Sequence, residues 1–181
     1  MTHNENINID DLPEELKGDI VPEIDPAKLF DEKEYATLII GGEDSTKKDI
    51  QNADLISIIV SYKATREEKD EALVKLKTNK ANTILLSAIK KTKSLSQKAL
   101  IIAACWETGL DFSKDYLFFI DLICSTDFTV SFEAFTVITE MDAEIYNDTL
   151  LKSQGILKTH MDTNNNAKTA YEYISSKLTS N

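Results

Sequence analysis

Residues 94–141 read SLSQKALIIAACWETGLDFSKDYLFFIDLICSTDFTVSFEAFTVITEM, and this stretch decides the fold class. Its apolar residues recur every three or four positions, as they do on one face of an α-helix. Ser94 and Asp127 stand where two of the periodic segments begin, and both are residue types that cap helices. Gly109 follows the first segment at a position that often ends a helix. The stretch therefore predicts three helices with short connections.

The segment after Asp127 is the ambiguous one, because its phenylalanines and valines favour strands by propensity. Its polar residues Thr129, Glu133, Thr136 and Glu140, however, repeat every three to four positions. We interpret the segment as a helix on that ground. The residues expected to face the core at the same spacing are Val130, Ala134, Val137 and Met141.

The helical pattern continues on both sides of this stretch. Thr65 and Glu68 have the spacing of a capping box ahead of one helix, and Asp142 is the predicted cap of another. About seven to eight helices are expected in all. Residues 115–141 repeat the plan of residues 83–108, which predicts antiparallel helix pairs stacked in a short α-α superhelix.

The chain changes character before residue 49. All 3 prolines lie in the first 26 residues, and residues 1–48 hold 13 acids and 5 lysines. Apolar residues are too scattered in this part to bury a face, so it is predicted to be a mostly disordered acidic arm. We therefore expect two regions, an arm over residues 1–48 and an all-α helical domain over residues 49–181.

The charge map narrows the choice of partners. A net charge of -11 repels nucleic acid and anionic membranes at long range. Residues 72–106 nevertheless carry 7 lysines and no acid. A solvated surface is one interpretation of this Lys-rich band, and an acidic partner or a cover formed by the arm of the same molecule is another. The candidate partner-binding residues in the band are Lys90, Lys91, Lys93 and Lys98.

Three stretches carry a resemblance to a known family: AACWETGLDFS (103–113), YLFFIDLI (116–123) and FEAFTVITEM (132–141). Together they resemble an uncharacterised family of small bacterial HEAT-like helical repeat proteins, with an armadillo-like fold. HEAT and armadillo relatives mostly act as binding scaffolds, so the resemblance implies an interaction role. The usual HEAT repeat uses Asp and Arg for a ladder between units, whereas this chain has the single arginine Arg66.

The residue types present permit little catalytic chemistry. His3 and His160 are the only histidines, and the sequence lacks a GxxxxGK[ST] loop, a GxGxxG turn and a GxSxG elbow. We expect neither a metal nor a cofactor. The rival hypothesis is an enzyme that uses Cys105 as a nucleophile or carboxylates in a groove, although a buried free cysteine is usually a packing residue. The groove candidates are Trp106, Glu107, Asp121, Glu133 and Glu140.

The remaining features point to a cytoplasmic protein. The chain has only 2 cysteines, which form no CxxC pair and fit a reducing compartment. Its longest apolar run, residues 99–106, is far short of the roughly 20 residues that span a bilayer, and residues 1–11 lack the pattern of a signal peptide. We therefore expect a non-catalytic scaffold or adaptor whose partner is a protein rather than nucleic acid or a membrane.

Overall fold

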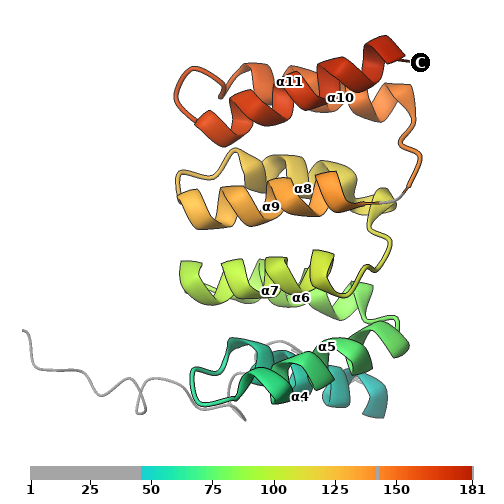
Figure 1. The fold of residues 1–181 in the computed structure, drawn as a ribbon, viewed down its shortest axis with the longest axis vertical. Helices are drawn as coiled ribbons and strands as arrows, with labels where there is room; N and C mark the ends of the chain where they lie inside the picture. The colour runs from blue at the N-terminus through green and yellow to red at the C-terminus, as the bar shows by residue number, and fades with distance from the viewer. Residues whose placement is uncertain (1–45, 142, 181) are drawn as a thin grey trace, which may run out of the picture. The chain divides into compact units, whose positions relative to one another are not determined.

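The computed structural model describes residues 46–141 and 143–180, which belong to one compact unit. These residues form eight α-helices, packed in sequential pairs, and no strand. Figure 1 shows the four pairs following one another along the long axis of this unit. The helices are α4 (Lys47–Val60), α5 (Arg66–Thr78), α6 (Asn82–Lys91), α7 (Leu95–Glu107), α8 (Tyr116–Ile123), α9 (Phe128–Glu140), α10 (Asn147–Lys158) and α11 (Asn165–Ser180).

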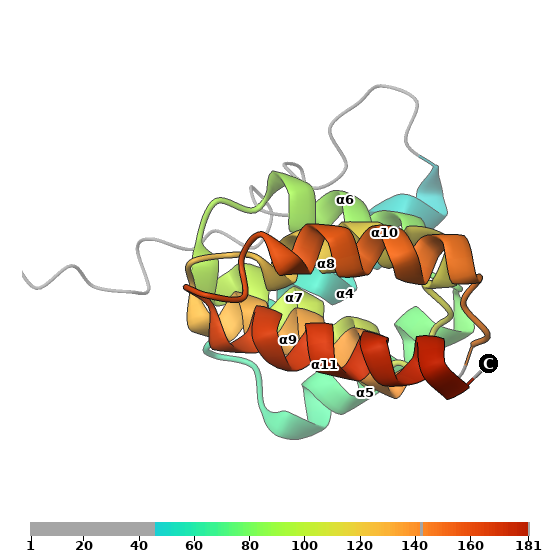
Figure 2. The same ribbon diagram turned by 90° about the horizontal axis from the view of Figure 1, so that it is seen from above.

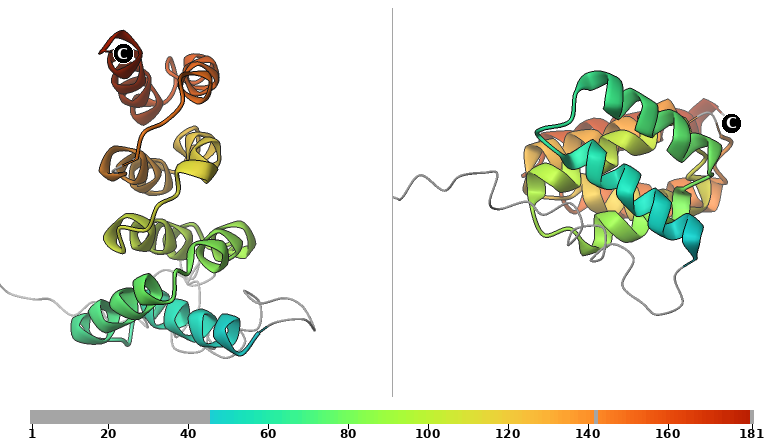
Figure 3. Two further views of the ribbon diagram at one scale, coloured as in Figure 1. Left: turned by 90° about the vertical axis from the view of Figure 1, so that its right-hand side faces the viewer. Right: turned by 90° about the horizontal axis from the view of Figure 1, so that it is seen from below.

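The pairs are arranged in two layers. The side view of Figure 3 places α5, α7, α9 and α11 in one layer and α4, α6, α8 and α10 in the other. Helices α7 and α9 pack closely along each other, α9 also packs on α11, and α8 packs on α10. Seen from above in Figure 2, α9 and α11 run in similar directions, because each hairpin reverses the chain. The layer of α7, α9 and α11 is therefore parallel within itself.

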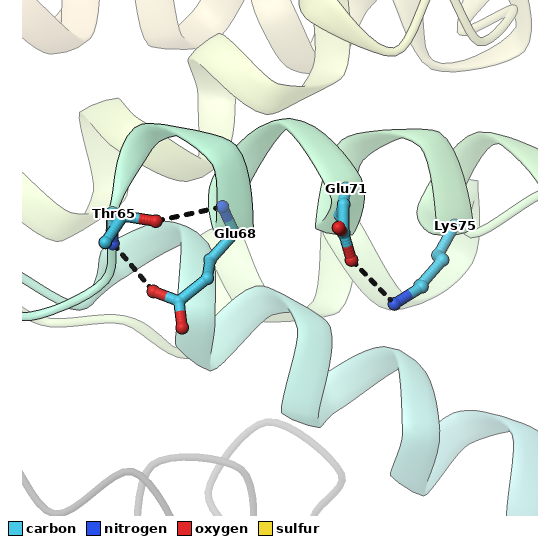
Figure 4. Close-up of polar contacts among 4 residues, drawn as sticks. All are labelled: Thr65, Glu68, Glu71 and Lys75. Carbon is cyan, nitrogen blue, oxygen red and sulfur yellow. Dashed lines mark hydrogen bonds and ion pairs between the residues drawn. The ribbon is translucent and has the colours of Figure 1, made fainter.

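Local sequence sets several helix ends. Thr65 and Glu68 form the predicted capping box: Glu68 N donates to Thr65 Oγ1 at 3.2 Å, and Thr65 N donates to Glu68 Oε2 at 2.7 Å (Figure 4). Ser94 accepts from Gln97 N and Asp127 accepts from Val130 N, so both predicted caps are confirmed. Gly109 ends the α7 region with a φ of +60°, a conformation that favours glycine.

Two predicted boundaries differ from the structure. The prediction that Asp142 caps a helix is wrong, because α10 begins at Asn147 and no side chain caps it. The predicted domain start at Asp49 is late, since Thr46 already caps α4 through a reciprocal bond with Asp49. The rest of the predicted arm, residues 1–45, lies outside the described residues.

The core lies between the two layers and is centred on α7, α8 and α9. Its largest side chains include three aromatic rings, and Phe112 packs edge-on against Phe119 with ring centroids 5.5 Å apart. Because both layers contribute, each helix keeps one face for the core and one for solvent. The fully buried residues of this centre are Ile101, Ile102, Phe112, Tyr116, Phe119, Ile120 and Ile123.

Asparagine side chains bridge segments that are distant in sequence. Asn79 Nδ2, in the turn after α5, donates to Asn52 Oδ1 of its partner helix α4 at 2.8 Å, and Asn82 Nδ2 donates to the carbonyl of Asp111 at 2.7 Å. Asn164 Nδ2 donates to the carbonyl of Ser125 at 2.8 Å and to that of Ile123 at 3.0 Å. The Asn82 and Asn164 bonds satisfy backbone carbonyls, and those of Asn164 join the last helix pair to the end of α8 in the preceding pair.

Candidate functional site

The most unusual surface of the described residues lies on the first halves of α7 and α9. Four large apolar side chains are exposed there: Leu95, Leu100, Phe128 and Phe132, which we call the α7–α9 face. Phe128 and Phe132 stack on each other with ring centroids 6.0 Å apart and an interplanar angle of 18°. Their relative exposures of 69% and 46% leave both rings in solvent, where a stacked aromatic pair is costly unless something covers it.

The neighbours of this face within the same layer are polar. On α5 the exposed positions carry charged residues, among them Glu67 and Glu71, and on α11 they carry residues such as Lys168 and Glu172. An apolar centre with a polar rim is the usual anatomy of a protein–protein interface. The middle two helices of the layer therefore expose four large apolar side chains, whereas α5 exposes Val74 alone among mostly charged residues.

Acidic side chains gather toward the C-terminal ends of α7 and α9. Trp106 is half-buried, and its Nε1 donates to Glu133 Oε2 at 2.9 Å, which connects the two helices. Burial raises the pKa of Glu107, and repulsion from Glu133 and Asp70 raises it further, against the opposing effect of Arg66. Four of the five predicted groove residues, Trp106, Glu107, Glu133 and Glu140, thus lie on these two packed helices.

A pocket of about 160 Å³ opens beside this acidic region. Its walls come from the last turns of α7 and α9 and from the chain that follows each of them, and we call it the C-end pocket. Glu140 and Asp111 bring carboxylates to it, while most of the other side chains are apolar. The pocket is lined by Cys105, Trp106, Gly109, Leu110, Asp111, Val137, Glu140, Met141 and Ala143.

Asp121 does not join the other groove candidates. It is exposed on α8, in the opposite layer. Burial raises the pKa of the Cys124 thiol, and the negative charge of the nearby Asp121 raises it further. Asp121 interrupts an apolar run, a pattern that fits a solvent-facing position on a helix, and α8 does turn this residue to solvent.

The Lys-rich band is divided by the fold. Lys75, Lys77 and Lys80 lie at the end of α5 or just after it, whereas the four candidate lysines lie at the other end of α6 and on α7. Lys75 pairs with Glu71 at 3.4 Å, as Figure 4 shows. Lys90 Nζ stands 5.1 Å from the ring centroid of Phe118, Lys91 and Lys98 are half-buried, and Lys93 is exposed in the turn. The role of these lysines in binding stays a prediction.

The cysteines have neighbours that sequence reasoning did not expect. Cys105 is fully buried, its Sγ donates to the carbonyl of Ile101, and burial raises the pKa of its thiol. His160 lies instead beside Cys124, in a pocket of about 320 Å³. Its Nδ1 is 2.9 Å from Thr159 Oγ1. Because a thiol is a nucleophile only as thiolate, the raised pKa values disfavour both cysteines for that role.

Residues that carry the α7–α9 face were missing from the predicted site. On α9, Phe128 and Phe132 lie outside the buried face, which begins with Val130. On α7, Leu100 lies outside the buried face that includes Ala99 and Ile102. That displacement was the available signal, because a large apolar residue off the buried stripe of an amphipathic helix faces solvent.

A cluster of metal ligands and a membrane-spanning helix are both absent from the described residues. No group of three or more His, Cys, Asp or Glu side chains in residues 46–141 and 143–180 is placed to hold a metal ion. Within the same ranges, no helix has both the length and the apolar character needed to cross a bilayer. Comparisons of the chain with models of protein families, with curated proteins and with solved structures found no match.

Proposed function

We propose that the chain is a non-catalytic interaction module of the cytoplasm that binds a segment of a partner protein on the α7–α9 face. The observation that carries this proposal is the exposed stack of Phe128 and Phe132 on α9, with Leu95 and Leu100 exposed on α7, the helix that packs against it. Large apolar side chains left in solvent on two packed helices are typical of binding sites. Val74 and Leu151 are also exposed, but on α5 and α10, and neither has an aromatic stacking partner among the described contacts.

The helix arrangement supports a HEAT-like interpretation of the domain. Sequential antiparallel pairs bury their apolar faces on the next pair, and one layer presents a continuous set of parallel helices. In HEAT-like stacks, such a layer provides an extended surface for partner segments. We propose that α7 and α9 provide that surface in this chain.

The chemistry of the candidate nucleophiles favours binding over catalysis. The Cys105 thiol is buried with a raised pKa, and His160 lies by Cys124 rather than by Cys105. The carboxylates of Glu107 and Glu133 stand near an indole and other acids, with no histidine beside them in the contacts of the described residues. Burial and like-charge repulsion account for the raised pKa of Glu107, and the same negative charges can serve the recognition of a cation.

The test is affinity capture from cells with the tagged full chain, quantified by mass spectrometry. We expect a partner that wild type retains and that the Leu100→Ser, Phe132→Ser double variant loses. Leu151→Ser is the matched control, because Leu151 is 55% exposed on α10 and its replacement removes a similar apolar side chain elsewhere. An identical captured set for wild type and the double variant would show that the face is not a binding site.

A further inference from the structure

We propose that the partner segment is amphipathic and basic, and that one of its Lys or Arg side chains enters the C-end pocket. This inference rests on the proposed function and adds to it the chemistry of the partner and the place of its anchor. Two features of the described residues carry it, namely the lining of the C-end pocket and the sign of the charges around it.

The C-end pocket suits a long aliphatic side chain that ends in a cation. Its volume of about 160 Å³ is several times the roughly 30 Å³ that one water molecule occupies in the liquid, so a side chain has room. Trp106, Val137 and Met141 line the pocket and offer apolar surface for a methylene stem. Glu140 and Asp111 supply carboxylates for the charged head.

The surroundings of the pocket are acidic. Glu107 and Glu133 lie on the same two helices as the pocket, and Glu107 is repelled both by Glu133 and by Asp70. Basic side chains also approach this region: Arg66 is paired with Asp70 at 3.9 Å, Lys77 Nζ is near Gly109, and Lys114 is near Asp111. Five acids, Asp70, Glu107, Asp111, Glu133 and Glu140, thus stand against these three cations.

Charge complementarity decides between the possible occupants. A second copy would bring the same acidic rim against itself, and residues 1–48 of the same chain carry 13 acids against 5 lysines. Both are therefore repelled from the C-terminal ends of α7 and α9, whereas a basic segment is attracted. Helix α9 contains no Lys or Arg, and Lys77, whose Nζ lies near Gly109 at the pocket, is an exposed side chain that a partner's cation can displace.

The length of the site sets the length of the segment. Helix α7 has 13 residues, so the distance from its first turn to the C-end pocket is roughly 20 Å at 1.5 Å per residue. A helical segment of about four turns covers that distance, with apolar residues at i and i+4 over the face and the cation at one end.

The experiment selects displayed random 14-residue peptides on the immobilised full chain, with counter-selection on the Leu100→Ser, Phe132→Ser variant. We expect the retained peptides to be enriched in apolar residues at helical spacing and in Lys or Arg. The best peptide is then synthesised with a fluorophore and titrated by anisotropy. Its affinity should fall about tenfold for Glu140→Gln and stay within twofold for Asp148→Asn, which makes the same charge change on α10.

The possible outcomes separate the two proposals. Peptides that require the α7–α9 face but show no excess of Lys or Arg, or whose affinity ignores Glu140→Gln, would overturn this inference and leave the proposed function standing. No face-dependent peptide at all would overturn the proposed function as well. A dimer in sedimentation velocity that Phe132→Ser converts to monomer would identify a second copy as the occupant, and this inference would then be wrong.

Discussion

Helices α5 and α9 have the same length, 13 residues, and are stabilised by different means. The capping box of Thr65 and Glu68 starts α5, acids occupy its first turn and lysines its last, and only Ala72 and Leu76 are buried. Helix α9 has a single cap and no ion pair in the described contacts, but it buries five residues against α7, α8 and α11. Local sequence thus maintains α5, whereas packing maintains α9.

This difference matters for function because it decides what each helix can expose. A helix held by its own surface charges must keep them, so α5 exposes mostly charged residues, with Val74 as its large exposed apolar side chain. A helix held by its buried side is free to place Phe128 and Phe132 in solvent. The α7–α9 face is available for binding because the core behind it supplies the stability.

The largest expected effect comes from shortening a buried side chain in each helix. Ile138→Ala in α9 should lower the free energy of unfolding, followed by Trp106 fluorescence, by about 2 to 4 kcal/mol. Leu76→Ala in α5 should lower that value by about 2 kcal/mol, the low end of the range for a fully buried leucine, because α5 packs mainly on α4 alone. Faster amide exchange over residues 66–78 should accompany this loss. Equal losses of unfolding free energy would contradict the contrast.

A smaller effect is expected at the cap of α5. Thr65→Ala removes the hydroxyl that accepts from Glu68 N and should destabilise α5 by about 1 kcal/mol. Amide exchange should accelerate in α5 and not in α9. Thr129→Ala, an exposed threonine within α9, is the control and should leave both exchange rates unchanged.

One buried hydroxyl lacks a hydrogen bond in the part of the domain that is stabilised by packing. The hydroxyl of Tyr116 in α8 is buried and has no hydrogen-bond partner among the described residues, and burial raises its pKa. Tyr116→Phe removes the unpaired hydroxyl and should raise the free energy of unfolding by up to about 1 kcal/mol. Thermal and urea unfolding measure the change. A loss of stability would mean that the hydroxyl has a partner.

The smallest effect concerns Glu107, whose carboxylate is repelled by Glu133 of α9 and by Asp70 of α5. Its pKa is raised in the folded chain, so folding opposes ionisation and stability falls as the pH rises through the titration range of this carboxyl. Glu107→Gln should therefore stabilise the chain at pH 7, by a few tenths of a kcal/mol at this exposed site. The gain should fade as the pH falls through the ordinary Glu pKa of about 4.3 and should be gone by about pH 3, where Glu107 is protonated in both states. A gain that persists there would show that repulsion is not its cause.

The parts of the fold that sequence predicted are those governed by short-range chemistry. The side chains of Thr65, Ser94 and Asp127 each accept a hydrogen bond from a backbone N–H three residues later. Thr, Ser and Asp are common capping residues, so these caps could be predicted from residue type and spacing alone. The predicted cap at Asp142 failed because a capping residue type is also a common loop residue, and α10 starts only at Asn147. The bridging bonds of Asn164 were invisible, since they join residues about 40 positions apart.

The candidate site was predicted only in part for the same reason. Trp106, Glu107, Glu133 and Glu140 were named from sequence, and packing of α7 on α9 brings them together. Asp121 is separated from the other groove candidates because α8 lies in the opposite layer, and the Lys-rich band is divided because of the direction in which α6 runs. Neither the layer of a helix nor its direction can be predicted from a short window of residues.

The parallel course of α5, α7, α9 and α11 within one layer has an electrical consequence. Every peptide group in a helix contributes a dipole, and each helix carries about half a negative charge at its C-terminal end. Because these four helices run in similar directions, their carbonyl ends lie toward the same end of the layer, where Glu107 and Glu140 also stand. The backbone therefore adds its own field to that of the carboxylates, and a cation arriving at the C-end pocket is attracted even by parts of the chain that carry no formal charge.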